Sequence, residues 1–154
     1  DEPFLSQGYR DLAERVKLID YIAEGLPSDR VSVHVCGFIG RYGVIDHLLK
    51  LENVGVLSFA FAGRIERPNI DHVSAKGFRD GGKKLGVGAT AVTPMTVEEV
   101  HSPTDVAKRV HEVAARVGRE NLAYVHPDCG MRATNKDMVP IILTNMQAGV
   151  DSVG

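Results

Sequence analysis

A strictly alternating stretch, Val31-Ser32-Val33-His34-Val35-Cys36, decides how this chain folds and where its chemistry lies. A period of two is typical of a β-strand. It places Ser32, His34 and Cys36 on one face of the predicted strand and the three valines on the other. The imidazole and the thiol therefore point to the same side, near the end of the strand.

The second cysteine follows another apolar run, Leu122-Ala123-Tyr124-Val125-His126. This run also predicts a strand, and the Pro127-Asp128 turn places Cys129 just beyond its end. Two thiolates and an imidazole from separate strand ends suit Zn²⁺, which takes sulfur and nitrogen ligands tetrahedrally and keeps one position open when it is catalytic. The sequence thus predicts a zinc site made by His34, Cys36 and Cys129.

Two other interpretations of these residues stay open. The chain has 2 cysteines, so a disulfide between them is the main alternative. A cytosolic setting and the adjacent histidine favour a metal over that disulfide. The three residues could also be purely structural, as two unreactive thiols and a hydrogen-bonded core histidine.

Length and composition are those of one domain. The chain has 154 residues, of which 44% are hydrophobic and 25% charged, which predicts a single domain over residues 1–154 that buries a core. A formal net charge of −2 with mixed signs gives no electrostatic footprint for nucleic acid or an anionic membrane surface. No apolar run approaches the ~20 residues needed to span a bilayer, and no signal peptide is visible. We therefore expect a cytoplasmic protein with neither nucleic acid nor membrane as a partner.

Predicted strands and helices alternate along the chain. Apolar residues at helical spacing predict a helix over residues 9–24, and Ser102, Pro103 and Asp105 predict the start of a helix that ends at Gly118. Other predicted helices cover 42–51, 69–84 and 136–148, and other predicted strands cover 56–61 and 85–92. About five βα units of this kind predict an α/β fold with a parallel sheet. The sheet is either part of a (β/α)₈ barrel, which needs ~250 residues to close, or an open doubly wound sheet.

Three motifs together resemble one family. Asp1-Glu2-Pro3, His34-x-Cys36 and Pro127-Asp128-Cys129-Gly130 occur in this order, separated by βα-like segments. The chain resembles, over nearly its whole length, the C-terminal catalytic domain of cobalamin-independent methionine synthase and its shorter archaeal and bacterial relatives. The resemblance implies a (β/α)₈ TIM barrel, of which this chain covers only the C-terminal part. It also implies a zinc-dependent methyltransferase that converts homocysteine to methionine, with methyltetrahydrofolate or a methylated corrinoid protein as the methyl donor.

The resemblance implies roles for further residues. Asp1 and Glu2 would lie near the amino group of the substrate. The acid–base histidine of the family falls at Thr93 of this chain, and His101, in a His-Ser-Pro sequence that the family shares, is the candidate to replace it. His126 is a candidate to support the metal ligands by hydrogen bonding.

One metal ligand of the family is missing at the aligned position. The family has a glutamate as its fourth ligand, and Ala60 stands at that position. An alanine cannot bind metal, so the site has three ligands and an open position, or is weakened, or uses Glu66 from the following loop. A site that lacks one ligand should hold Zn²⁺ more weakly.

Two other functions stay open. The chain could be a related zinc-dependent thiol alkyltransferase, similar to epoxyalkane:coenzyme M transferase, which shares the His-x-Cys motif and a distal cysteine. It could also be a non-catalytic metal-binding fragment. Asp1-Glu2-Pro3 looks like the exit of a strand whose body is missing, so we expect the missing N-terminal part of the barrel, or a second copy in a homo-oligomer, as a partner.

Overall fold

The computed structural model describes residues 3–8 and 11–154. Among these residues it has a four-stranded sheet, formed by β1 (Ser32–Val35), β2 (Val56–Ala60), β3 (Lys84–Thr90) and β4 (Leu122–Pro127). The α-helices are α1 (Leu12–Ala23), α2 (Val44–Leu48), α3 (Ala75–Asp80), α4 (Pro103–Val117) and α5 (Val139–Asp151). The expectation of about five βα units is therefore too high by one strand for the described residues.

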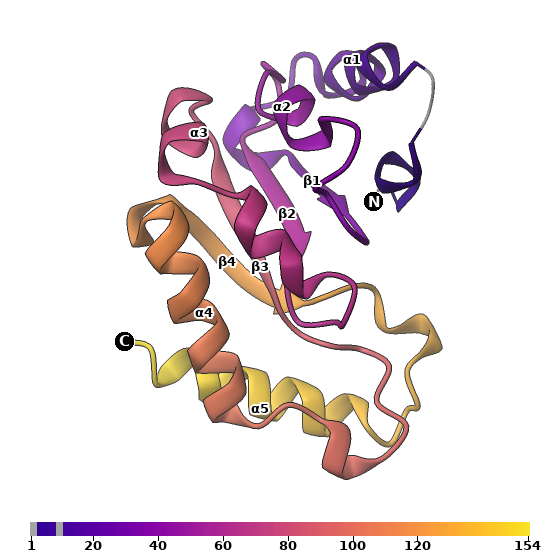
Figure 1. Cartoon of the computed structure of the whole chain (residues 1–154), viewed down its shortest axis with the longest axis vertical. Coiled ribbons are helices and arrows are strands. Elements are labelled where there is room, and N and C mark those ends of the chain that lie inside the picture. Colours follow the sequence, from indigo (N-terminus) through magenta and orange to yellow (C-terminus); the bar gives the residue numbers. More distant parts are fainter. Residues whose placement is uncertain (1–2, 9–10) are drawn as a thin grey trace.

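The order of the strands decides between the two architectures left open by the sequence. The strands pair in parallel in the order β1-β2-β3-β4, which is also their order in the chain, and Figure 1 shows them side by side in this order. A doubly wound sheet reverses its order at a switch point, whereas a barrel does not. Right-handed crossovers in one direction also place successive helices on one face of the sheet. The sheet is therefore of the barrel type.

The two faces of the sheet differ in the size of their side chains. Leu57, Phe59 and Phe61 are fully buried and belong to the same core cluster as the buried valines of α4, which are Val106, Val110, Val113 and Val117. The opposite face carries Ser58 on β2 and the glycines Gly86 and Gly88 on β3. A hydrocarbon core thus forms between sheet and helices, and small residues line the concave face.

The concave face requires these glycines. A Cβ on Gly88 would lie 2.9 Å from the Cα of Ala60 and 2.8 Å from Oδ1 of Asp128. A Cβ on Gly86 would lie 2.6 Å from the ring of Tyr124. Both contacts are shorter than van der Waals distance, so β3 must present backbone here for side chains of β4 to fold over it.

The predicted helices were confirmed in most cases. In α4 the Ser102 side chain accepts a bond from the Asp105 amide, and the Asp105 side chain accepts one from the Ser102 amide, which is the predicted capping box. α1 lies within the predicted 9–24. α2 is shorter than predicted, because Tyr42 and Gly43 have positive φ angles of 59° and 66° and delay its start. α5 begins and ends three residues later than predicted.

The single helix predicted over 69–84 is wrong. The segment forms a 3₁₀ helix, η3 (Arg67–His72), and then the short α3. Val73 between them is extended, and the Ser74 side chain accepts a hydrogen bond from the Gly77 amide to start α3 afresh. Local capping by a serine hydroxyl competes with a continuous helix, and here it interrupts the helix. None of the helices in the described residues is long and apolar enough to cross a membrane.

Candidate metal centre

The three predicted ligands meet at the carboxyl ends of the first and last strands. Nε2 of His34 lies 3.1 Å from Sγ of Cys36, and this sulfur lies 2.7 Å from Sγ of Cys129. The three ligand atoms all lie within 4.8 Å of one another, and they form the one group of this kind among the described residues. Two sulfurs and one nitrogen that converge in this way are the donor set of many zinc sites.

The two thiols are separate in the structure. Both cysteines are free, and their sulfur atoms are 2.7 Å apart, whereas a disulfide bond is about 2.05 Å long. The structure therefore does not contain the disulfide that the sequence left open.

Among the described residues, the groups named below as acting on the Cys36 thiol all disfavour its charged form. Burial, then the hydrogen bond and charge of Cys129, and the carboxylates of Glu66 and Asp128 together raise the pKa of Cys36 to about 12. On its own the site therefore disfavours a thiolate at Cys36. A divalent cation between the sulfurs would supply the charge that this arrangement needs, so the residues fit a metal ion.

The ring nitrogen of His34 that does not contact Cys36, Nδ1, has its own hydrogen-bond partner. This nitrogen lies 2.8 Å from Oγ of Ser58, and this oxygen lies 2.8 Å from Nε2 of His126. Burial lowers the pKa of His34, and it also lowers that of His126. Both rings are therefore neutral at pH 7, which is the form of imidazole that binds metals.

Asp128 fixes the loop that carries Cys129. Its buried carboxylate accepts hydrogen bonds from the amides of Phe61, Ala62 and Gly63, at distances of 2.6 to 3.1 Å. Burial raises the pKa of Asp128 to about 6, against the lowering effect of these amides. The bonds join the loop after β4 to the loop after β2, so the position of Cys129 is set by backbone groups of another strand.

Asn69 fixes the loop after β1 in a similar way, through hydrogen bonds to backbone groups. This buried side chain accepts a bond from the Ile39 amide and donates to the carbonyl groups of Gly37 and Ala60. Sequence analysis missed the roles of Ser58, Asn69 and Asp128. Asp128 lies within a motif that the sequence had singled out, whereas Ser58 had only its inward position as a signal.

Two cavities open beside the cluster. One, of about 330 Å³, is lined by both cysteines together with Ala60, Glu66, Thr93 and Asp128, among others. The other, of about 340 Å³, is lined by His34, Ser58, Tyr124, His126 and Cys129, among others. The methyl group of Ala60 and the carboxylate of Glu66 thus border the same space as the thiols, which leaves room for a ligand beside them.

His101 lies outside the cluster. Nδ1 of His101 accepts a hydrogen bond from the Ala91 amide at 3.2 Å and lies 3.4 Å from Oγ1 of Thr90. Burial, and then the charge of Arg109, lowers its pKa, while Asp105 raises it. His101 is not among the residues that line the two cavities beside the thiols. Asp1 and Glu2 lie outside the described residues.

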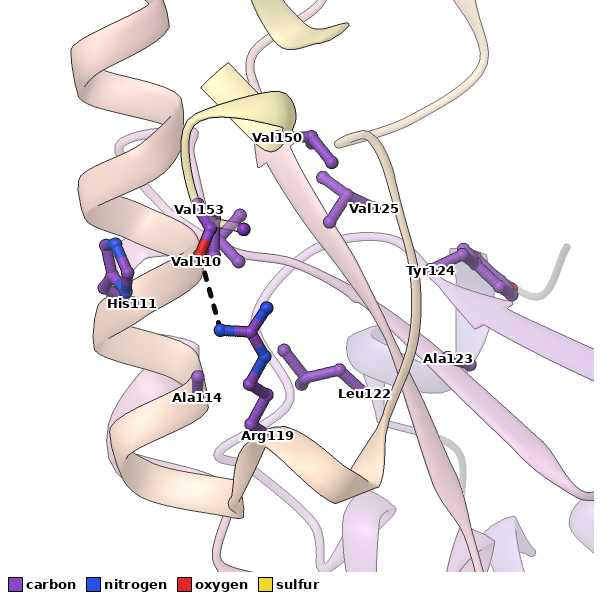
Figure 2. Close-up of a pocket in the computed structure, with 11 residues that line it drawn as sticks. Val110, His111, Ala114, Arg119, Leu122, Ala123, Tyr124, Val125, Val150 and Val153 are labelled. Carbon is purple, nitrogen blue, oxygen red and sulfur yellow. Dashed lines mark hydrogen bonds between the residues drawn. The ribbon is translucent and has the colours of Figure 1, made fainter. Parts of the chain in front are cut away.

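A third cavity has a different character. It measures about 350 Å³ and lies between α4, β4 and α5, where Val110, Leu122, Val125, Val150 and Val153 line it. Figure 2 shows these apolar side chains around Arg119, whose Nη1 donates to the Val153 carbonyl at 3.3 Å. Its polar lining residues do not converge on a point, so the cysteine and histidine cluster is the stronger candidate for chemistry.

Fold and site together define a class of protein: a barrel-type α/β protein with a group of sulfur and nitrogen donors that could hold a metal ion at the carboxyl ends of its strands, where barrel enzymes carry their active sites. The family model of the cobalamin-independent synthase catalytic domain matches residues 1–151. The chain belongs to this family.

Individual relatives agree with this assignment. The chain is 40% identical over 146 residues to a methionine synthase of Methanothermobacter thermautotrophicus, covering 95% of this chain and 44% of the relative. It is 27% identical to a methionine synthase of Thermococcus kodakarensis, covering 99% of this chain and 42% of the relative. The chain thus spans less than half the length of these relatives.

A solved structure confirms the barrel-type fold. The structure of a B12-independent methionine synthase from Shewanella, in complex with selenomethionine, superposes with a TM-score of 0.75 at 19% identity. The match covers 99% of this chain and 47% of that one. The strand order of the sheet and this superposition both exclude the doubly wound alternative.

Proposed function

We propose that this chain carries the zinc-binding and thiol-activating part of a methyltransferase that converts homocysteine to methionine. The observation that carries the proposal is the donor set of His34, Cys36 and Cys129, whose ligand atoms lie within 4.8 Å of one another. Family membership supports the reaction, and so does the selenomethionine, an analogue of the product, in the Shewanella relative.

The ligands explain why this site suits a thiol. Two thiolates balance the two charges of Zn²⁺, and neutral His34 adds a third ligand without further charge. Zinc held by these residues would supply the positive charge that keeps a substrate thiol deprotonated at neutral pH. The sulfur of homocysteine then takes the methyl group as the bond from methyl to donor breaks. The thiol proton replaces the methyl group on a folate donor, so atoms and charge balance.

We propose His101 as the acid–base group for this proton. Its Nδ1 accepts from the Ala91 amide, so in the neutral ring the proton is on Nε2 and available for transfer. A folate donor needs such an acid at its leaving nitrogen, whereas a methylcorrinoid donor does not. Replacement by glutamine, His101→Gln, should lower turnover with methyltetrahydrofolate and leave zinc content unchanged. Equal turnover in variant and parent would remove His101 from the mechanism.

We also propose Asp1 and Glu2 as contacts of the amino group of homocysteine. A carboxylate there would pair with the ammonium group and would orient the substrate. Asp1→Asn should raise the KM for homocysteine more than it lowers kcat. An unchanged KM in both Asp1→Asn and Glu2→Gln would contradict these contacts.

We also propose partners for the chain, from the edges of its sheet, and a cellular location, from its thiols. Within the described residues β1 pairs only with β2, and β4 only with β3, so we propose that further parallel strands, from another part of the protein or a second copy, complete the barrel. Light scattering of the purified chain, alone and with the preceding part of a relative, would measure this association. Thiols that must stay reduced to bind metal support a cytosolic location.

The central experiment measures metal content. We expect one zinc per chain, with two sulfur ligands by X-ray absorption that become three when homocysteine is added. Cys36→Ser and Cys129→Ser should each lose stoichiometric zinc. The control His111→Gln removes an imidazole outside the cluster and should retain it. Full zinc in both serine variants would overturn the site, and a third sulfur from coenzyme M but not from homocysteine would favour the alkyltransferase alternative.

A further inference from the structure

A chain of hydrogen bonds runs across the concave face and ends at the proposed metal ligand. It starts at the Pro127 carbonyl, which lies 2.6 Å from Nδ1 of His126. Nε2 of His126 lies 2.8 Å from Oγ of Ser58, and this oxygen lies 2.8 Å from Nδ1 of His34. Three strands contribute to this relay, which we define as Pro127, His126, Ser58 and His34.

The position of each proton follows from the first member. A carbonyl group only accepts, so Nδ1 of His126 carries a proton. The two rings are packed edge to face at 5.3 Å. Part-burial disfavours the charged form of each ring, and a second charge so close would add repulsion, so both rings are neutral. Nε2 of His126 then has no proton and accepts from the Ser58 hydroxyl.

The last hydrogen bond of the relay determines which nitrogen of His34 carries the proton. Ser58 has one hydroxyl proton and gives it to His126, so its Oγ accepts from the N–H at Nδ1 of His34. In a neutral ring this leaves the lone pair on Nε2, the nitrogen that lies 3.1 Å from Sγ of Cys36. The relay thus leaves free the one nitrogen of His34 that faces the thiols.

We infer that Ser58 and His126 are positioning residues that hold His34 in the tautomer whose Nε2 faces Cys36 and Cys129. The inference rests on the proposed metal site for its purpose. Pro127, the final acceptor, belongs to the same loop as Asp128 and Cys129, so the orientation of one ligand is coupled to the loop that carries another. Groups that hold a histidine ligand from its far nitrogen typically change metal affinity about 10- to 100-fold when they are removed.

The burial of Ser58 supports a specific role. Its side chain is only 2% exposed, and its hydroxyl contacts both imidazoles. Ser32 provides the matched control, since it lies on the same face of β1, two residues from His34, but its hydroxyl contacts Tyr124. A comparison of Ser58→Ala with Ser32→Ala therefore distinguishes the loss of the relay from a general loss of polarity on this face.

The test reads the tautomer directly, without metal or turnover. In nitrogen NMR of the metal-free 154-residue chain, His34 should carry its proton on Nδ1. Ser58→Ala should give a mixture of tautomers and about 10- to 100-fold weaker zinc binding. Ser58→Thr keeps the hydroxyl, so it should show the single His34 tautomer and the zinc affinity of the parent. Ser32→Ala should change neither the tautomer nor the zinc affinity.

Two further outcomes are decisive. An unmixed Nδ1–H tautomer with full zinc affinity in Ser58→Ala would overturn the inference. If Ser58→Ala does not fold, His126→Leu removes the acceptor for Ser58 and must disturb the His34 tautomer in the same way, or the inference fails. Failure of the proposed function looks different, because the parent chain would then bind no zinc while the tautomer of His34 still responded to Ser58→Ala.

Discussion

Ser32 and Tyr124 share a hydrogen bond of 2.6 Å between their hydroxyl groups, although they lie on the two outermost strands of the sheet. Three strand spacings in a flat sheet would separate β1 and β4 by about 14 Å. The sheet is therefore curled so strongly that its first and last strands meet through side chains. This curvature brings Cys36 and Cys129 together at one end of the concave face.

The bond between Ser32 and Tyr124 should contribute a measurable coupling. Both side chains are partly accessible to water, so we expect about 0.5–1 kcal/mol in a double-mutant cycle of Ser32→Ala and Tyr124→Phe. The measurement is urea unfolding of the four proteins of the cycle. Strictly additive losses would show that the bond does not help to hold the curled sheet.

Gly88 should be the least replaceable residue of β3. A Cβ there would lie 2.8 Å from the Phe59 carbonyl oxygen and 2.9 Å from the Ala60 Cα, which are backbone atoms that cannot rotate away. We expect Gly88→Ala to lower the free energy of unfolding by about 1–3 kcal/mol. In Gly130→Ala the new methyl group meets nothing within 4 Å, so this control should match the parent. Equal midpoints in urea for all three proteins would contradict the close approach of β2 and β3.

A carboxylate at position 60 should strengthen the metal site. Ala60 lines the cavity that also contains Cys36 and Cys129, so Ala60→Glu places an oxygen ligand beside the thiols. We expect zinc to bind about tenfold more tightly or better, as a fourth ligand would. Without zinc the buried charge should destabilise the fold by about 1–3 kcal/mol.

The matched variant Ala60→Gln separates charge from size. It should destabilise the fold without tightening zinc binding, when both variants are titrated with zinc against a competing chelator. Equal affinities of Ala60→Glu and Ala60→Gln would mean that position 60 does not reach the metal.

The capping box of α4 should give the chain a pH-dependent increment of stability. Hydrogen bonds from the Ser102 side chain and then from its amide lower the pKa of Asp105. A carboxyl group whose pKa is lower in the folded state stabilises the fold above its unfolded pKa of about 3.9, and this stabilisation is lost as the pH falls through the folded value. We expect Asp105→Asn to cost about 0.5–1 kcal/mol at pH 7 and progressively less below pH ~4.

Urea unfolding between pH 3 and pH 7 measures this difference. The control Asp29→Asn removes an exposed carboxylate from another segment and should show little change. If the difference in the free energy of unfolding between Asp105→Asn and the parent stays constant down to pH 3, the loss of stability comes from the shape of the side chain and not from its charge.

The sequence predicted those features that depend on neighbouring residues. Alternation placed His34 and Cys36 on one face of β1, and the spacing of Ser102, Pro103 and Asp105 marked the start of α4. The meeting of His34, Cys36 and Cys129 was also predicted, because both cysteines close strand-like runs and parallel strands bring their carboxyl ends together.

The roles of Ser58, Asn69 and Asp128 depend on distant pairing and were missed, whereas a supporting role for His126 was predicted. The hydrogen bond between Ser58 and His126 joins residues 68 apart in the chain, and Asp128 accepts its hydrogen bonds from amides 65 to 67 residues earlier. No local pattern distinguishes such residues from ordinary polar positions. The helix predicted over 69–84 failed for a related reason, since apolar spacing does not reveal that the Ser74 hydroxyl starts a new helix.

The position of the two thiols also bears on how the protein is made. Cys36 and Cys129 are 93 residues apart, and β2 and β3 lie between them in both sequence and sheet. A chain still emerging from the ribosome that has not yet exposed β4 presents one thiol without its partner. It can neither close an internal disulfide nor capture a metal ion through both sulfurs, so metal uptake at this pair would mark the moment when β4 has been synthesised and has joined the sheet.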